Sequence, residues 1–117
     1  MKIAIVGSRN YPKLDIVDAH VRILDPEATI VSGGAAGVDI TAENAAKSVG
    51  MKTIVYLPDW SQGKGAGFAR NSLIVEAADV IIGFWDGASR GVIDTLKKAK
   101  KADKPYQIYG PSGERLR

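Results

Sequence analysis

Ile30-Val31-Ser32-Gly33-Gly34-Ala35-Ala36-Gly37-Val38-Asp39 is the most informative stretch of this chain. An apolar β-branched run leads into a loop of small residues, and a helix-forming segment, residues 40–49, follows directly. Glycines let backbone N–H groups approach a ligand, and a helix N-terminus adds partial positive charge. Such glycines also occur in purely structural turns, but three of them before a helix favour an anion-binding loop.

Strand-like and helix-like segments alternate along the whole chain. Strands are expected at residues 3–6, 29–31, 53–57, 80–84 and 105–109, and helices at residues 15–24, 40–49, 68–77 and 92–102. Strands that are apolar on both faces and alternate with helices are typical of a parallel sheet covered on each side. We therefore predict an α/β fold: a single Rossmann-like domain over residues 1–109, with a parallel five-stranded sheet and helices on both faces, followed by a loose C-terminal tail, residues 110–117.

Composition narrows the classes of function. A length of 117 residues suits one domain, and a formal charge of +3 suits phosphate-bearing small molecules without by itself indicating nucleic acid. The absence of cysteine excludes disulfides, zinc–thiolate sites and cysteine nucleophiles. The chain enters a strand directly after Met1-Lys2, and no apolar run approaches the ~20 residues of a membrane span. We expect a cytoplasmic protein with no membrane partner.

The loops at the carboxyl ends of the strands carry the candidate site residues, because ligands of such sheets bind there. The first two loops supply Gly7, Ser8, Arg9, Ser32, Gly33, Gly34, Gly37 and Asp39. The planar fork of Arg9 suits a phosphate, although an isolated arginine is also common on a surface. Asp39 either complements the helix dipole and caps free N–H groups or contacts a ribose hydroxyl.

The third and fourth loops add cationic and small residues. The third contributes Lys64 among glycines, then Arg70 and Asn71 in the expected first helical turn, where an arginine opposes the dipole and therefore indicates an anion. The fourth contributes Trp85, Ser89, Arg90 and Gly91. Ser89 is a good helix cap, and Trp85, like Trp60, either stacks on a base or closes the core. Asp94, in the first turn of the last helix, is expected to face the same cleft as Arg70.

Two further features have plainer interpretations. The run Lys97, Lys98, Lys100, Lys101 and Lys104 resembles a nucleic-acid patch, but lysines at a helix C-terminus favour the dipole and solubility. The single histidine, His20, lies far from the loops, so no Ser–His–acid triad is expected. No cluster has metal-ligand spacing, and we expect neither a metal nor a cofactor.

Together the loops resemble the SLOG superfamily, in particular its small YspA-like branch. The matching segments are Gly7-Ser8-Arg9-Asn10-Tyr11, residues 32–39, Asp59-Trp60, residues 63–67, Arg70-Asn71 and residues 78–91. The resemblance covers nearly the whole chain, and it implies a Rossmann-like domain that senses or processes a nucleotide or a nucleotide-derived ligand.

The superfamily includes the LOG phosphoribohydrolases, whose pattern is an arginine–lysine pair followed by PGGxGTxxE. Arg70-Asn71 matches the pair and Gly91 the glycine before threonine, and Asp94 stands at the catalytic glutamate. Asn71 replaces the lysine, and Val92 the threonine. The resemblance implies catalytic roles for Arg70 and Asp94 in cleaving an N-glycosidic bond, where a carboxylate stabilises oxocarbenium character and orients water.

These features favour a nucleotide-binding protein. N-glycosidic hydrolysis and pure sensing remain alternatives for that ligand. Another class of function is a single-stranded nucleic-acid-binding module, because the DNA-processing protein DprA uses a related fold. Related families often dimerise, which makes a homodimer the expected assembly.

Overall fold

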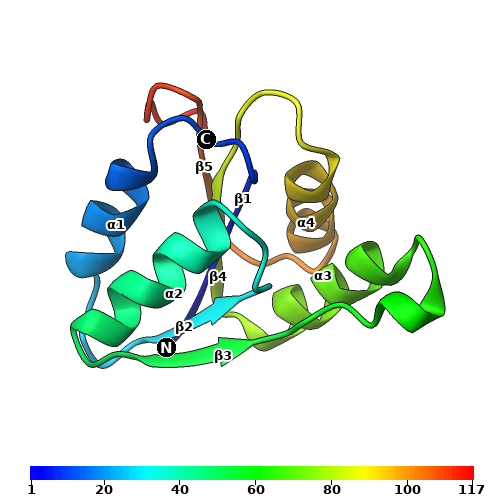
Figure 1. Ribbon diagram of the computed structural model, residues 1–117, viewed down its shortest axis with the longest axis horizontal. Coiled ribbons are helices and arrows are strands. Elements are labelled where there is room, and N and C mark those ends of the chain that lie inside the picture. The colour runs from blue at the N-terminus through cyan, green and yellow to red at the C-terminus, as the bar shows by residue number, and fades with distance from the viewer.

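The computed structural model describes all 117 residues. One five-stranded parallel sheet has the order β3-β2-β1-β4-β5, with β1 (Lys2–Gly7), β2 (Thr29–Ser32), β3 (Lys52–Val55), β4 (Val80–Phe84) and β5 (Tyr106–Tyr109). The helices are α1 (Leu14–Arg22), α2 (Val38–Ser48), α3 (Ala66–Ala77) and α4 (Arg90–Lys101), with a short 3₁₀ helix, η1 (Trp60–Gln62). Helices α1 and α2 cover one face of the sheet, and α3 and α4 cover the other (Figure 1). The predicted fold class is confirmed.

The sheet separates two hydrophobic cores. Successive side chains of a strand point to opposite faces. Strand β1 accordingly sends Ile3 and Ile5 into the core under α1 and α2, and Ala4 and Val6 into the core under α3 and α4. The largest fully buried side chain is Phe84 at the end of β4, which packs in the first core. The central strands are therefore held rigidly from both sides, and they fix the loops at their carboxyl ends.

Three helices begin two residues earlier than the sequence predicted, at Val38, Ala66 and Arg90. For α4 the reason is the cap: Ser89 accepts a hydrogen bond from the N–H of Val92, so the helix starts at the next residue. This corrects the placement of two site residues. Arg70 and Asp94 lie one turn inside their helices rather than in the first turn.

The C-terminal segment, residues 110–117, is not loose. It folds back beside β5, with an antiparallel bridge between Tyr109 and Arg115 and a hydrogen bond of 2.7 Å from the N–H of Leu116 to the carbonyl of Ile108. The hydroxyl of Tyr11 also donates to the carbonyl of Gly110 at 2.7 Å. These backbone contacts explain why the expectation of a loose tail is wrong.

The four α-helices are all too short or too polar to span a bilayer.

Candidate functional site

A pocket of about 480 Å³ opens at the carboxyl edge of the sheet. Its size falls within the usual range for small-molecule sites, roughly 300–1,000 Å³. The loops after β1, β2 and β3 and the N-terminal halves of α3 and α4 form most of its walls. The lining residues are Val6, Gly7, Arg9, Gly33, Gly34, Ala35, Asp39, Leu57, Pro58, Trp60, Lys64, Gly67, Phe68, Arg70, Asn71, Ile74, Gly91, Val92 and Thr95. The structure thus brings loops far apart in sequence to one cavity.

The sequence-predicted residues divide into two groups. Those that line the pocket are Gly7, Arg9, Gly33, Gly34, Asp39, Lys64, Arg70, Asn71 and Gly91. Those that do not line it are Ser8, Ser32, Gly37, Trp85, Ser89, Arg90 and Asp94. Most members of the second group have structural contacts that explain their presence at this edge.

The buried hydroxyls of the first two loops hold backbone and helix in place. Ser32 Oγ donates to Glu43 Oε2 at 2.6 Å, and Ser8 Oγ accepts a hydrogen bond of 3.0 Å from the N–H of Asp86. Gly37 has φ +83°, and a Cβ there would lie 2.5 Å from the carbonyl oxygen of Arg9. Glycine at this position therefore lets the two loops pack together.

The loop after β4 is also stabilised internally. Trp85 Nε1 donates to the carbonyl of Ser89 at 3.2 Å, so this indole closes the loop and packs against the second core. Asp86 accepts the N–H groups of Ala88 and Ser89, which lower the pKa of its carboxyl. Arg90 is exposed on α4. This loop supports the edge without facing the pocket.

Arg70 is held in a fixed orientation in the pocket wall. Its Nη1 donates to the carbonyls of Gly33 and, at 3.2 Å, Tyr56, and its Nε donates to Asn71 Oδ1 at 3.0 Å. Its second terminal nitrogen, Nη2, has no protein partner in these hydrogen bonds. A guanidinium that is held by three acceptors and keeps one terminal nitrogen available to donate is suited to binding an anion.

Asp39 and Arg70 lie on the same side of Gly33. An alanine Cβ at position 33 would stand 2.5 Å from Arg70 Nη1 and 2.9 Å from Asp39 Oδ2, so both groups meet at the same backbone. Asp39 is only 4% exposed; its Oδ2 accepts the N–H of Ala35 at 3.3 Å, while its buried Oδ1 has no partner. The expected contact with a free N–H is present, but it uses one oxygen only.

Burial sets the titration of Asp39. Loss of solvent raises the pKa of its carboxyl from 3.8 to about 6, and the nearby carboxylate of Glu43 adds to the rise. The N–H of Ala35, the positive charge of Arg70 and, least, the N–H of Gly33 act in the opposite direction. A carboxyl that titrates near neutrality in a pocket is characteristic of functional sites.

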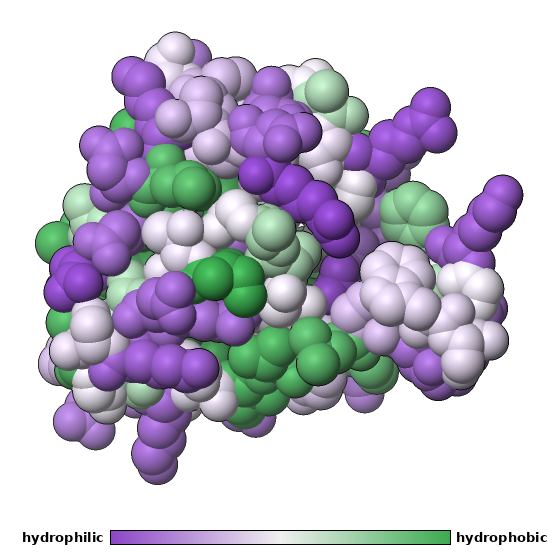
Figure 2. Space-filling model, viewed as in Figure 1, coloured by the Kyte–Doolittle hydropathy of each residue, from purple (hydrophilic) through white to green (hydrophobic).

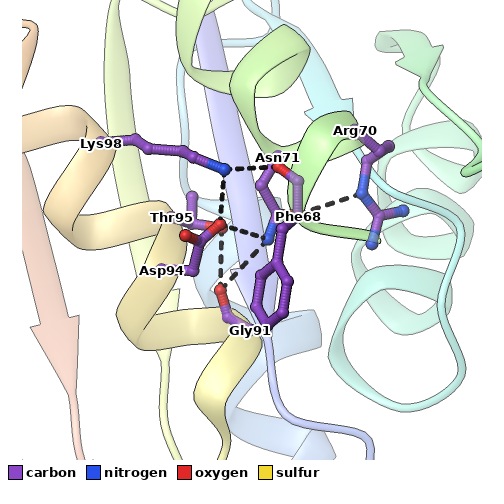
Figure 3. A network of polar contacts seen from close by, with 7 residues as sticks. All are labelled: Phe68, Arg70, Asn71, Gly91, Asp94, Thr95 and Lys98. Atoms are coloured by element: carbon purple, nitrogen blue, oxygen red, sulfur yellow. Dashed lines mark hydrogen bonds and ion pairs between the residues drawn. The ribbon is translucent and has the colours of Figure 1, made fainter. Parts of the chain in front are cut away.

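Asp94 belongs to a polar network behind the pocket (Figure 3). Its Oδ2 accepts hydrogen bonds from Asn71 Nδ2 at 3.2 Å and from Lys98 Nζ at 2.7 Å. Lys98 also donates to the carbonyl of Phe68. Arg70 faces the pocket and Asp94 does not, so the expectation that both face one cleft is wrong. Because α4 begins earlier than predicted, Asp94 turns toward α3 and orients Asn71, which in turn binds Arg70 Nε.

Two aromatic side chains line the pocket that are not among the site residues predicted from sequence. They are Trp60, for which the sequence leaves base stacking and core closure open, and Phe68, and they are 62% and 46% exposed. Exposed aromatics beside an anion site are the signal that identifies them. The glycines around residue 67 mark the segment, but they do not reveal which aromatic faces the cavity.

The lysine run has structural partners. Lys104 Nζ donates to the carbonyls of Val75, Glu76 and Ala78 at 2.6, 2.8 and 2.7 Å, and so caps the C-terminus of α3. Lys98 is engaged by Asp94. Two of the five lysines are therefore committed to packing α4 on α3, which favours the structural interpretation of this run.

Fold and pocket together define a Rossmann-like α/β protein with a cationic pocket at the carboxyl edge of its sheet. Residues 1–64 match the model of the family described as DNA recombination-mediator protein A. The match spans more than half of the 117 residues, so the chain belongs to that family. This result supports the SLOG-type, Rossmann-like superfamily that the sequence resembled.

Solved structures agree with this assignment. DNA processing protein A (DprA) from Streptococcus pneumoniae is 25% identical, with a TM-score of 0.79 over 93% of this chain and 49% of that chain. DNA processing protein A from Helicobacter pylori, described for its single-stranded DNA binding mode, is 27% identical, with a TM-score of 0.70 over 99% of this chain and 66% of that chain. The protein TM1055 is 20% identical, with a TM-score of 0.74 over 90% of this chain and 71% of that chain, and it shows the fold alone. The chain thus spans about half the length of the pneumococcal protein. No curated protein matches the sequence.

Proposed function

We propose that this chain binds a nucleotide or nucleotide-derived ligand in the pocket, with its phosphate at Arg70. The observation that carries the proposal is the guanidinium of Arg70, fixed by Gly33, Tyr56 and Asn71 with Nη2 left over. Arg9 and Lys64 line the same cavity and add positive charge. Three cations around one small-molecule pocket favour a phosphate over a neutral ligand.

Other residues of the pocket lining suit a nucleobase. Trp60 and Phe68 present exposed aromatic side chains to the pocket, and Leu57 and Pro58 extend the apolar surface. Stacking on an aromatic side chain contributes about 1–3 kcal/mol per base, whatever the base. A ligand with a flat ring at one end and a phosphate at the other matches these aromatic and cationic lining residues.

The sequence motifs quoted above support a place for this chain in the small YspA-like branch of the superfamily.

N-glycosidic hydrolysis through Asp94 stays a hypothesis. A carboxylate that stabilises an oxocarbenium ion must lie against the sugar, whereas Asp94 does not line the pocket and is bound by Asn71 and Lys98. Binding without turnover is therefore the form of the proposal that the geometry supports best. Chromatography for released base, run on every binding mixture, tests the hydrolysis directly.

Thermal unfolding with adenosine 5′-monophosphate tests the binding. Saturation at about 100 times Kd adds roughly 2.7 kcal/mol, which is several degrees for a chain of this size. Arg70→Ala should abolish the ligand-induced shift, whereas Arg90→Ala, which removes an exposed arginine outside the pocket, should retain it. An equal shift in both variants would remove Arg70 from the site.

Single-stranded DNA binding is the second candidate, favoured by family membership and by the Helicobacter pylori relative. A DNA-binding surface loses affinity steeply as salt rises, because bound cations are released from the phosphates. Titration of a labelled oligonucleotide between low and moderate salt, with Lys97→Ala and Lys101→Ala as surface variants, separates this candidate from the pocket. Sensitivity to both lysines and to salt, with no effect of Arg70→Ala, would favour DNA.

The homodimer expected from related families has a candidate surface. Hydrophobic side chains gather along the lower edge of the molecule, over β3 (Figure 2), where Val55 and Leu57 are exposed and the strand ends the sheet. Unpaired edge strands readily pair with another chain. We propose association through this edge. Light scattering during size-exclusion chromatography measures it, with Val55→Glu as the disrupting variant because Val55 does not line the pocket.

A further inference from the structure

One charged residue in the pocket lining has the opposite sign to the others. Arg9, Lys64 and Arg70 are cationic, and Asp39 is the only carboxylate among the lining residues. A buried carboxylate repels the phosphate that the three cations attract, and its own desolvation is costly. Support of the helix does not require this arrangement, because an N-terminal acid performs that role from an exposed position. The position of Asp39 is therefore explained if the ligand carries a hydrogen-bond donor that the carboxylate can accept.

The hydrogen bonds of Asp39 show that an acceptor is available. Oδ2 is used by the N–H of Ala35, but Oδ1 is buried and unpaired. Buried acceptors almost always have partners, and an unpaired one carries a free-energy cost. A donor on the bound ligand would supply the missing partner once the carboxyl turns to present Oδ1, which has almost no accessible surface in this orientation.

Geometry indicates which part of a nucleotide carries that donor. Asp39 and Arg70 converge on Gly33, so a phosphate at Arg70 places the adjoining part of the ligand beside Asp39. The exposed aromatics Trp60 and Phe68 are the expected base contacts, and the sugar connects phosphate to base. We propose that Asp39 accepts a hydrogen bond from the ribose 2′-hydroxyl, so that the pocket selects ribonucleotides over 2′-deoxyribonucleotides.

This inference rests on the proposed nucleotide binding and adds its sugar specificity. It also opposes DNA as the occupant of the pocket, because DNA lacks the 2′-hydroxyl. A hydrogen bond to a carboxylate is stronger than one to a neutral acceptor. We expect the wild-type protein to bind adenosine 5′-monophosphate about 10- to 100-fold more tightly than its 2′-deoxy counterpart.

Calorimetric titration of both nucleotides at pH 7.5 tests the proposal. Asp39→Ala should weaken binding of adenosine 5′-monophosphate to the level of the deoxynucleotide and leave the deoxynucleotide affinity the same or higher. Asp39→Asn keeps the side-chain shape with a neutral acceptor, and it should lower the preference by a smaller factor. Glu43→Gln is the matched control: Glu43 is a buried acid on the same helix that does not line the pocket, so the preference should remain.

Equal affinity of the wild-type protein for the two nucleotides would overturn the inference, and so would a preference unchanged by both Asp39 variants. A uniform loss of affinity for both nucleotides in Asp39→Ala would also overturn it. These outcomes differ from failure of the proposed function, in which the wild-type protein binds neither nucleotide or Arg70→Ala leaves both affinities intact.

Discussion

Replacing Asp39 by asparagine should make the protein progressively more stable than the wild type as pH rises from 4 to 7. Burial raises the pKa of Asp39 from 3.8 to about 6 in the folded protein. At 1.36 kcal/mol per pKa unit, this difference corresponds to about 3 kcal/mol of stability lost by the wild type on full ionisation. Asparagine has no proton to lose in this range, so the variant avoids that loss.

The pH window follows from the two protonation states. Below about pH 3 the carboxyl is mostly protonated in both the folded and the unfolded chain, and its contribution is nearly constant. Between the unfolded pKa of 3.8 and the folded pKa of about 6, the folded chain binds more protons, so stability falls as pH rises. Above that window the whole cost is present. The charges of Arg70 and Glu43 act on Asp39 throughout, in opposite directions.

Urea unfolding at pH 4, 5, 6 and 7 measures the effect. The difference in unfolding free energy between Asp39→Asn and wild type should grow by about 2 kcal/mol across the series, because part of the full cost is already present at pH 4. Any fixed gain or loss from the new amide appears equally at every pH and does not alter this trend. Asp59→Asn is a control of opposite sign, because hydrogen bonds from Ser61 lower the pKa of Asp59. A difference that stays flat for Asp39→Asn would refute the reasoning.

Three further substitutions test the site and its supports. Gly33→Ala should weaken nucleotide binding by displacing Arg70, whereas Gly65→Ala, at a residue outside the pocket where a Cβ meets nothing within 4 Å, should not; calorimetric titration compares them. Lys104→Met should destabilise the protein by roughly 1–3 kcal/mol in urea unfolding, because three carbonyls at the end of α3 lose their donor, and Lys101→Met should change little. Tyr11→Phe should cost about 1 kcal/mol and speed hydrogen exchange in residues 110–117, and unchanged exchange would show that other contacts hold the tail.

The fold was predictable because its signals are local. Short apolar runs such as residues 80–84 alternate with helical segments, and that alternation fixes a parallel sheet with two covered faces. Helix starts were harder to place. Residues 65–67 consist of two glycines and an alanine, which have no amphipathic pattern, and only packing against η1 shows that the helix includes Ala66 and Gly67.

The sequence predicted that the site lies at the carboxyl edge of the sheet, but it did not predict which side chains face the pocket. Parallel strands bring their carboxyl ends together, so Arg9, Gly33 and Arg70 could be expected near one another from sequence. The direction of each side chain depends on helix phase, and an error of two residues in the start of α4 moved Asp94 from the pocket to the interior of a network. The absence of a hydrogen-bond partner for Asp39 Oδ1 depends on tertiary packing, so no sequence pattern predicts it.

The stability and the ribose preference of Asp39→Asn are measured on the same variant, and the ribose preference separates a ligand-binding role of Asp39 from a helix-capping role. If asparagine weakened the hydrogen bond from the N–H of Ala35, that loss would be the same at every pH, and the ribose preference rather than the pH trend would separate the two roles. If the buried charge is retained for a ligand, Asp39→Asn should be more stable at pH 7 and less selective for ribose. A residue that lowers stability while improving recognition is characteristic of a binding site. Greater stability with unchanged selectivity would indicate a buried charge that the proposed ligand does not use.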